Sequence, residues 1–116
     1  KQLNFTDDIA NNIINTGWIS QQEMNLAYSV SDITLVLSIY LDPFPTVVLE
    51  SMRLDTPVIA SVYSGAKEAV DDVADKVLKI LYDDKLHHSM SDQSKKEFEQ
   101  TFTLEKCVNQ YLDLLI

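Results

Sequence analysis

The sequence predicts an α/β fold with a doubly wound parallel sheet of the Rossmann-like kind. Short apolar runs alternate with segments of helical periodicity, which is the order that βαβ units produce. The runs at residues 33–37 and 58–62 are almost continuously apolar, as expected of strands that are covered on both faces. The 116 residues are enough for a core, and we expect them to form part of a single domain.

The first third of the chain predicts one strand and one helix. Residues 13–16 suit a short strand that ends at Gly17. Ser20 is a good N-cap, and Glu23, three residues later, completes a capping box at the start of a helix. The apolar face of that helix is expected to consist of Met24, Leu26, Ala27 and Val30.

A second helix is predicted between the two apolar runs. It covers about residues 46–54, and Pro45 suits its first turn. The sequence Asp55-Thr56-Pro57 ends it just before the strand at 58–62.

Two further helices are predicted in the second half of the chain. The one at 72–82 has apolar residues at helical spacing, namely Val73, Val77, Leu78 and Leu81. Residues 103–116 form the clearest amphipathic pattern, with Thr103 as cap and with Cys107 and Tyr111 expected in the core.

A strand is missing between these two regions. The loop at 64–68 is followed directly by a helical pattern, although an open α/β sheet usually places a strand after such a loop. We therefore expect a gap near 70–72, where residues of the natural chain are absent from the sequence.

Composition excludes several classes of function. Apolar residues make up 46% of the chain, and no run of about 18 apolar residues predicts a membrane span. The net charge is −9 and the nine basic residues are scattered, so no nucleic-acid surface is expected. No signal peptide is visible, and the single Cys107 fits a reducing compartment, so we expect a cytoplasmic protein.

The usual catalytic templates are absent from the sequence. Gly17 and Gly65 are the only glycines, which excludes Walker-type and G-x-G-x-x-G loops, and no Cys or His pair has zinc spacing. His87 and His88 are neighbours in a polar helix and point about 100° apart, so we expect a structural, exposed role for them.

The stretch "LDPFPTVVLESM" at 41–52 places two carboxylates eight positions apart at the carboxyl end of a strand, where open α/β sheets bind ligands. The amides of Thr46, Val47 and Val48 are donors at a helix N-terminus and favour a phosphate. Glu50 suits vicinal hydroxyls such as a ribose diol, and Asp42 suits the hydroxyls of a sugar. The alternative is a solvated Asp before a turn and a Glu that complements the helix dipole, and spacing alone favours that alternative.

Four blocks of the sequence follow the order of a known family. "TGWIS" with "QEMNLAYSVSDITLVLS" resembles "F-x-G-x-[VL]" followed by "L-x-x-x-Y-x-x-A-D-[VI]", and "DPFPTVVLESM" resembles "E-P-F-G-x-x-x-x-E-A-M". "DTPVIAS" resembles "G-x-P-V-[IV]-A-[ST]", and "SGAKEAV" resembles "[GT]-G-x-x-E-[IV]-[IV]". Residues 15–70 thus resemble the C-terminal, nucleotide-sugar-binding domain of retaining GT-B-fold glycosyltransferases, in the group 1 family related to glycogen synthase.

The resemblance implies the donor site of a hexosyltransferase that takes a UDP-, GDP- or ADP-sugar and needs no metal or other cofactor. Glu50 would bind the ribose, and Asp42 would contact the transferred sugar as the one catalytic position. The other donor-binding or nucleotide-binding residues implied are Phe44, Pro45, Thr46, Val47, Trp18, Ile19, Ser38 and Tyr40.

The sequence departs from the family pattern at several points. Asp42 is one methylene shorter than the family's glutamate, Pro45 replaces the commoner glycine, and Asp55 replaces a glycine at the end of the helix. The block "D-G-x-x-G-x-L" is missing at the predicted gap. The family's upstream Arg and Lys have no counterpart in this sequence. The family's N-terminal, acceptor-binding domain has no counterpart either. Any peripheral membrane contact is expected only through that domain. We therefore expect a fragment truncated on its N-terminal side that does not transfer sugar by itself.

Two alternatives remain beside a transferase. One is a non-catalytic GT-B-like partner that binds or stabilises another chain, which the changes at Asp42 and Pro45 favour. The other is a nucleotide-sugar epimerase of GT-B architecture, which requires further acidic residues in the missing domain. A receiver-like domain would cluster acidic residues at the end of its first strand, and none cluster there.

Overall fold

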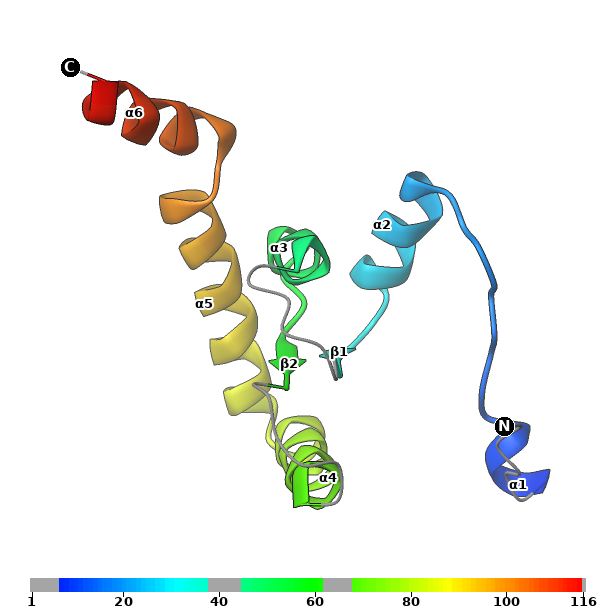
Figure 1. Ribbon diagram of the computed structural model, residues 1–116. Coiled ribbons are helices and arrows are strands. Elements are labelled where there is room, and N and C mark those ends of the chain that lie inside the picture. The colour runs from blue at the N-terminus through cyan, green and yellow to red at the C-terminus, as the bar shows by residue number, and fades with distance from the viewer. Residues whose placement is uncertain (1–6, 38–44, 62–67, 116) are drawn as a thin grey trace.

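The computed structural model describes residues 7–37, 45–61 and 68–115 (Figure 1). The predicted site residues Ser38, Tyr40, Asp42 and Phe44 lie outside these ranges. Along the described chain the elements are α1 (Asp7–Ala10), α2 (Gln21–Ser29), β1 (Thr34–Val36), α3 (Thr46–Arg53), β2 (Val58–Ala60), α4 (Glu68–Tyr82), α5 (Asp84–Thr101) and α6 (Leu104–Leu115).

A βαβ unit forms the centre of the molecule. Strands β1 and β2 pair in parallel, with Leu35 opposite Ile59, and α3 is the connection between them. The two strands fall within the predicted runs at 33–37 and 58–62, so the positions of both strands are confirmed. The expectation that the strands are covered on both faces is wrong for β1, because Leu35 is 46% exposed and no element covers that side in the described residues. The structure shows a mixed, helix-rich α/β fold with this small parallel sheet, in which α3 lies between α2 and α5 (Figure 1).

The core lies where α3, α4 and α5 meet the two strands. Its buried apolar side chains are those of Tyr28, Ile59 and Ile80, and Pro57 is fully buried beside them. Two hydroxyl residues, Ser51 and Thr56, are buried as well. Burial of polar side chains at this point requires hydrogen bonds.

The predicted strand at 13–16 is wrong. These residues form an irregular, exposed segment between α1 and α2, and the side chain of Ile14 is 88% exposed. A strand needs a neighbour to satisfy its backbone N–H and C=O groups, and along the described chain no strand lies beside this segment. In Figure 1 the segment runs away from the sheet.

The predicted apolar face of α2 is only partly correct. Leu26 and Val30 are exposed, whereas Tyr28, which was not expected on the covered face, is buried. The reason is that α3 packs against the face of α2 that carries Gln21, Asn25 and Tyr28. Packing partners, and not the apolar pattern alone, decide which face is covered.

Helix α4 begins earlier than predicted and passes through the position of the expected gap. It runs without interruption from Glu68 to Tyr82, where a loop and a helix from residue 72 were expected. In the part of α4 whose side chains are described, Ile80 is buried, while Leu78 and Leu81 are about half exposed. That residues of the natural chain are absent near 70–72 stays a prediction.

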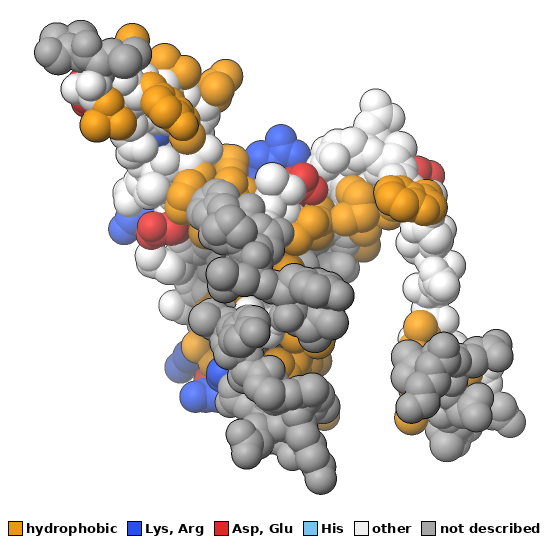
Figure 2. Space-filling view, in the orientation of Figure 1, with side chains coloured by type: hydrophobic (Ala, Val, Ile, Leu, Met, Phe, Trp, Pro, Cys, Tyr) orange, Lys and Arg blue, Asp and Glu red, His pale blue; other side chains and the backbone are white. Residues whose placement is uncertain are grey.

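Helix α6 extends from the end of α5 and is only lightly covered (Figures 1 and 2). Thr103 caps it, with its Oγ1 atom accepting from the Lys106 amide at 3.4 Å. Tyr111 is 70% exposed and Cys107 is half-buried, so the expected place of both residues in the core is wrong. Within the described residues the main contacts of α6 are with α5, and most of its apolar stripe lies in solvent.

The polar helix α5 carries the two histidines. Asp83 caps it by accepting from the Leu86 amide at 3.0 Å. His88 is exposed as expected, while His87 is half-buried and its Nε2 lies 2.8 Å from the Asp32 carbonyl oxygen, in the segment that precedes β1. This contact gives His87 the structural role that was expected. No helix of the described chain is long and apolar enough to cross a membrane.

Candidate functional site

The side chain of Glu50 lies on the face of α3 that meets α2. Its Oε2 atom accepts a hydrogen bond from Gln21 Nε2 at 3.2 Å. Tyr28 of α2 lies close enough to this carboxylate to interact with its charge. Burial of the phenol, followed by the negative charge of Glu50, raises the pKa of Tyr28.

The residues of α2 that meet α3 lie on one helical face. Gln21, Asn25 and Tyr28 follow one another at spacings of four and three residues, which places them in one row. Next to the Glu50 contacts, Arg53 Nη2 donates to Asn25 Oδ1 at 3.1 Å. The two helices are therefore joined by polar contacts at neighbouring turns of α3.

A shallow hollow of about 390 Å³ lies between α2, α3 and the end of α5. It is lined by Gln21, Asn25, Leu49, Glu50, Arg53 and Phe98. The lining combines one carboxylate, one guanidinium, two amides and two apolar side chains. Such a mixture suits a ligand that has hydroxyl groups on one side and an apolar or planar face on the other.

A network of buried hydroxyl groups begins at Ser51, the residue after Glu50 in α3. The Ser51 hydroxyl is fully buried, 2.8 Å from Thr34 Oγ1 in β1 and 3.2 Å from the Thr56 carbonyl oxygen. The Thr56 hydroxyl donates to the Tyr28 carbonyl oxygen at 2.7 Å. The network thus ties α3, β1 and the end of α2 together and fixes the two helices that carry the Glu50 contacts.

Four residues of this region were not predicted from the sequence, namely Ser51, Thr56, Gln21 and Tyr28. A signal was available for two of them, because Ser51 and Thr56 are hydroxyl residues at either end of the turn between the predicted helix and strand. No local pattern could indicate that Gln21 and Tyr28 face Glu50, which lies more than twenty residues away.

At the C-terminal end of α3 stands Asp55, at the position where the family pattern has a glycine. The Thr56 amide donates to the Ser51 carbonyl and the Asp55 amide to the Met52 carbonyl, both at 3.2 Å, which is the Schellman pattern. Asp55 has a φ of 62°, a left-handed conformation that glycine adopts most easily. Asp55 also accepts from Lys95 Nζ of α5 at 2.9 Å, and this contact raises the pKa of Lys95.

The N-terminal end of α3 differs from the expectation in two details. Pro45 is the N-cap and not part of the first turn, and no side chain caps the helix there. The Val48 amide donates to the Pro45 carbonyl at 3.0 Å, so it is already used within the helix. The amides of Thr46 and Val47 come before Val48 at the N-terminus of α3, and amides at this place in a helix favour an anion.

Trp18 and Ile19 follow a tight turn before α2. Gly17 has a φ of 63°, and its amide donates to Asn15 Oδ1 at 3.0 Å. Trp18 is completely exposed and Ile19 is half-buried. Neither residue lines the hollow that contains Glu50.

The start of α2 has the predicted capping box. The Ser20 amide donates to Glu23 Oε2 at 2.7 Å, and the Glu23 amide donates to Ser20 Oγ at 3.3 Å. These hydrogen bonds to Ser20 hold the pKa of Glu23 below its ordinary value. The capping box therefore fixes the first turn of α2, where Gln21 projects towards Glu50.

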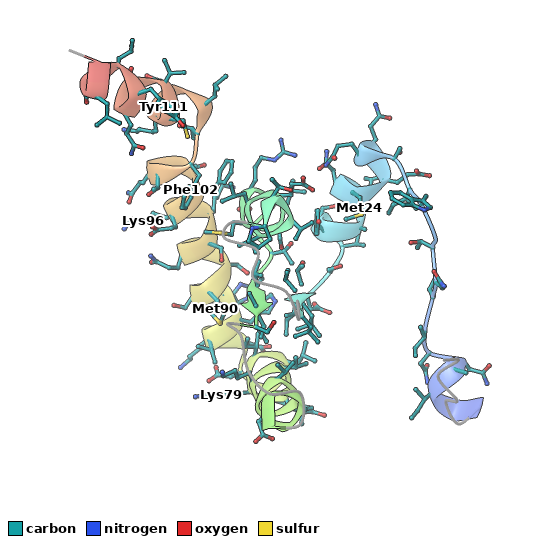
Figure 3. All side chains as sticks on the ribbon, viewed as in Figure 1. Met24, Lys79, Met90, Lys96, Phe102 and Tyr111 are labelled. Atoms are coloured by element: carbon teal, nitrogen blue, oxygen red, sulfur yellow. The ribbon has the colours of Figure 1, made fainter. Side chains whose placement is uncertain are left out.

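A second hollow lies against β2. It has a volume of about 320 Å³ and is bounded by β2, α4 and α5, with Lys79 and Met90 on its walls (Figure 3). Apolar side chains make up most of this lining, and none of the predicted site residues contributes to it. Throughout the described ranges, no group of three or more His, Cys, Asp or Glu side chains is arranged to hold a metal ion.

The comparison with protein families shows the family of the chain. The model of the family "Glycosyl transferases group 1" matches residues 6–97. The chain belongs to the group 1 glycosyltransferases. No curated protein and no solved structure matched it.

Membership in this family indicates a transferase that moves glycosyl groups, and in general a nucleotide-sugar donor. The matched region of this glycosyltransferase contains α2, α3 and both strands, and it ends within α5 before α6 begins.

Proposed function

We propose that this chain is the donor-binding part of a retaining glycosyltransferase of GT-B architecture. It would help to move a sugar from a nucleoside-diphosphate sugar to an acceptor bound by an N-terminal domain outside this chain. The observation that carries the proposal is the Glu50 carboxylate, which is held on the rim of the hollow one turn inside α3. The family membership supplies the class of reaction.

Glu50 would bind the ribose of the nucleotide. A carboxylate accepts hydrogen bonds from two vicinal hydroxyls, and such charge-assisted bonds are stronger than those between neutral groups. The hollow also offers the Arg53 guanidinium and the apolar surfaces of Leu49 and Phe98 as further walls. Trp18 and Ile19, on the segment that leads into α2, would flank the base.

The N-terminus of α3 would bind the diphosphate. Thr46 and Val47 place their amides at the positive end of the helix dipole, behind Pro45. The net charge of −9 means that cations from the upstream part of the domain must add to this attraction. Together they would stabilise the leaving nucleoside diphosphate, whose oxygens would assist deprotonation of the acceptor.

The remaining roles belong to residues outside the described ranges. Asp42 would contact the transferred sugar, with a shorter reach than the family's glutamate, and Ser38, Tyr40 and Phe44 would line the donor pocket. In this proposal the βαβ unit is one part of a larger doubly wound sheet. The proposed protein is cytoplasmic, uses no metal or other cofactor and binds no nucleic acid, and the 116 residues alone are inactive.

One observation favours a second candidate, a non-catalytic partner of GT-B architecture. Pro45 at the N-cap of α3 has no N–H to offer a phosphate, where the family commonly has glycine. The upstream sequence decides between the candidates, because a transferase needs the Arg and Lys that neutralise the diphosphate. Loss of both would favour the partner. An epimerase would instead convert the nucleotide sugar without any acceptor.

The donor site can be tested by calorimetric titration of the full-length protein with UDP, GDP and ADP. We expect one of them to bind, and Glu50→Ala to weaken that binding about 10-fold to 100-fold, because bonds to charged groups contribute about 1.5–3 kcal/mol. Glu97→Ala, at an exposed position of α5, is the matched control and should not change the affinity. Absence of binding by all three nucleotides, or an unchanged affinity in Glu50→Ala, would overturn the proposal.

A further inference from the structure

The carboxylate of Glu50 has a hydrogen-bond partner on the neighbouring helix. Gln21 of α2 donates from its Nε2 atom to Glu50 Oε2 at 3.2 Å, across the interface between α2 and α3. The two residues are 29 positions apart in the sequence, so the bond is a tertiary contact and not part of a helix cap. The orientation of the Glu50 side chain therefore depends on a helix other than its own.

The backbone of Gln21 has a well-defined place. Gln21 is the first residue of α2, directly after the N-cap Ser20. The capping box fixes this turn, with the Ser20 amide donating to Glu23 Oε2 at 2.7 Å and the Glu23 amide donating to Ser20 Oγ at 3.3 Å. At the other end of α2 the Tyr28 carbonyl oxygen accepts from the Thr56 hydroxyl at 2.7 Å. Because both ends of α2 are fixed, Gln21 reaches α3 from a defined position.

The donor to Glu50 is neutral, although a cation stands nearby on the same helix. Arg53 follows Glu50 by three residues, a spacing at which opposite charges on one helix can pair. Its Nη2 atom donates instead to Asn25 Oδ1 of α2 at 3.1 Å, and within the described ranges no ion pair joins Arg53 to Glu50. Glu50 is thus held by an amide, which does not neutralise its negative charge.

The bond to Gln21 leaves room for a diol on the carboxylate. A carboxylate has about four lone-pair sites, and Gln21 occupies a single one of them. The remaining sites are sufficient for the two hydroxyls of a ribose. A glutamate side chain that is already oriented also loses less conformational entropy when a ligand binds.

We propose that Gln21 is a positioning residue for nucleotide binding, whose side-chain amide orients the charged Glu50 carboxylate towards the ribose hydroxyls. Gln21 acts through Glu50 and does not bind the nucleotide itself. This inference rests on the proposed function of Glu50. It adds a role for the first turn of α2, which lies outside the motif around Glu50.

The next residue of α2 supplies a matched control. Gln22 has the same side chain and is exposed as well, but it does not line the hollow that contains Glu50. Adjacent residues of a helix project about 100° apart, so the two glutamines differ in direction. A change to alanine removes one amide at either position, and a change to glutamate adds one negative charge. Effects confined to position 21 therefore come from its contact with Glu50 and not from net charge.

The experiment is a calorimetric titration of the full-length protein with whichever of UDP, GDP and ADP binds, and with the 2′,3′-dideoxy form of that nucleotide. Gln21→Ala should weaken binding of the natural nucleotide about threefold to tenfold, the range expected for ordering one side chain. Gln21→Glu should weaken it further, because a second carboxylate repels that of Glu50. Gln22→Ala and Gln22→Glu should leave the affinity unchanged.

Two comparisons show whether Gln21 acts through Glu50, which a merely structural role would not do. Gln21→Ala should not change the affinity for the dideoxy nucleotide, because the hydroxyls that Glu50 would bind are absent from it. Gln21→Ala should also have no further effect in the Glu50→Ala background.

The outcomes separate this inference from the proposed function. If Glu50→Ala weakens binding but Gln21→Ala does not, the positioning role is wrong and the donor site stands. Equal weakening for the natural and the dideoxy nucleotide, or equal weakening with and without Glu50, would show that Gln21 does not act through the carboxylate. Tighter binding by Gln21→Glu than by Gln21→Ala, or equal losses at positions 21 and 22, would contradict the inference too. If no nucleotide binds the unaltered protein, both proposals are overturned.

Discussion

The Thr56 hydroxyl donates to the Tyr28 carbonyl oxygen at 2.7 Å, and this contact fastens the end of α2 to the turn that follows α3. Thr56 is 3% exposed, so its hydroxyl is shielded from water. The contact joins residues 28 positions apart in the sequence. It therefore helps to hold the end of α2 against α3.

Removal of the Thr56 hydroxyl should destabilise the fold. Thr56→Val keeps the shape of the side chain but removes the bond to Tyr28, and we expect the free energy of unfolding to fall by about 1 kcal/mol. Urea denaturation measures this change, and Ser89→Ala on the exposed face of α5 is the control. Equal stability of Thr56→Val and the unaltered protein would show that the contact is unimportant.

Asp55 should be replaceable by glycine with a gain in stability. Its φ of 62° is unfavourable for residues with a Cβ atom, and Asp55→Gly relieves this at the loss of one exposed ion pair with Lys95. We expect the free energy of unfolding to rise by about 0.5–1 kcal/mol for Asp55→Gly and to fall for Asp55→Ala. The opposite order of the two variants in denaturant would contradict the left-handed conformation at this position.

The capping box at the start of α2 should be sensitive to acid. The pKa of Glu23 is lowered in the folded state, so its contribution is present above the pKa of an unfolded glutamate, near 4.3. That contribution is lost as the pH falls through the folded-state pKa. The stability difference between the unaltered protein and Glu23→Gln should therefore shrink between pH 6 and pH 3, roughly the range over which such a group titrates. A difference that stays constant over this range would argue against the capping role.

Tyr28 should make the protein sensitive to alkali. Because its pKa is raised in the folded state, its contribution is complete below the pKa of an unfolded tyrosine, near 10. Above that value the unfolded chain loses the proton first, so stability falls as the pH rises. Tyr28→Phe should show a shallower loss of stability between pH 9 and pH 11, roughly the range around that value. The same slope in both proteins would mean that Tyr28 titrates as in the unfolded chain.

The sequence predicted the local features of the fold well. The capping box of Ser20 and Glu23, the two apolar strands and the helix between them depend on neighbouring residues, and the structure contains all of them. The family was also predictable, because its motifs occur in a fixed order around Glu50.

Features that depend on distant partners could not be predicted in the same way. Residues 13–16 have the composition of a strand but no strand beside them along the described chain. The apolar pattern of α2 favoured Leu26 and Val30, yet contact with α3 buries Tyr28 instead. Tyr111 and Cys107 lie on an amphipathic helix whose apolar stripe is mostly exposed. In each case the sequence indicates which residues can be buried, and the neighbouring element decides which of them are.

The central claim is that Glu50 binds the ribose of the donor nucleotide, and one comparison tests it most directly. The full-length protein and its Glu50→Gln variant are titrated with the nucleoside diphosphate that binds and with its 2′,3′-dideoxy analogue. The unaltered protein should prefer the natural nucleotide by about tenfold or more, and Glu50→Gln should lose most of this preference, since it removes a charged acceptor for the two hydroxyls. An equal preference in both proteins would contradict the account.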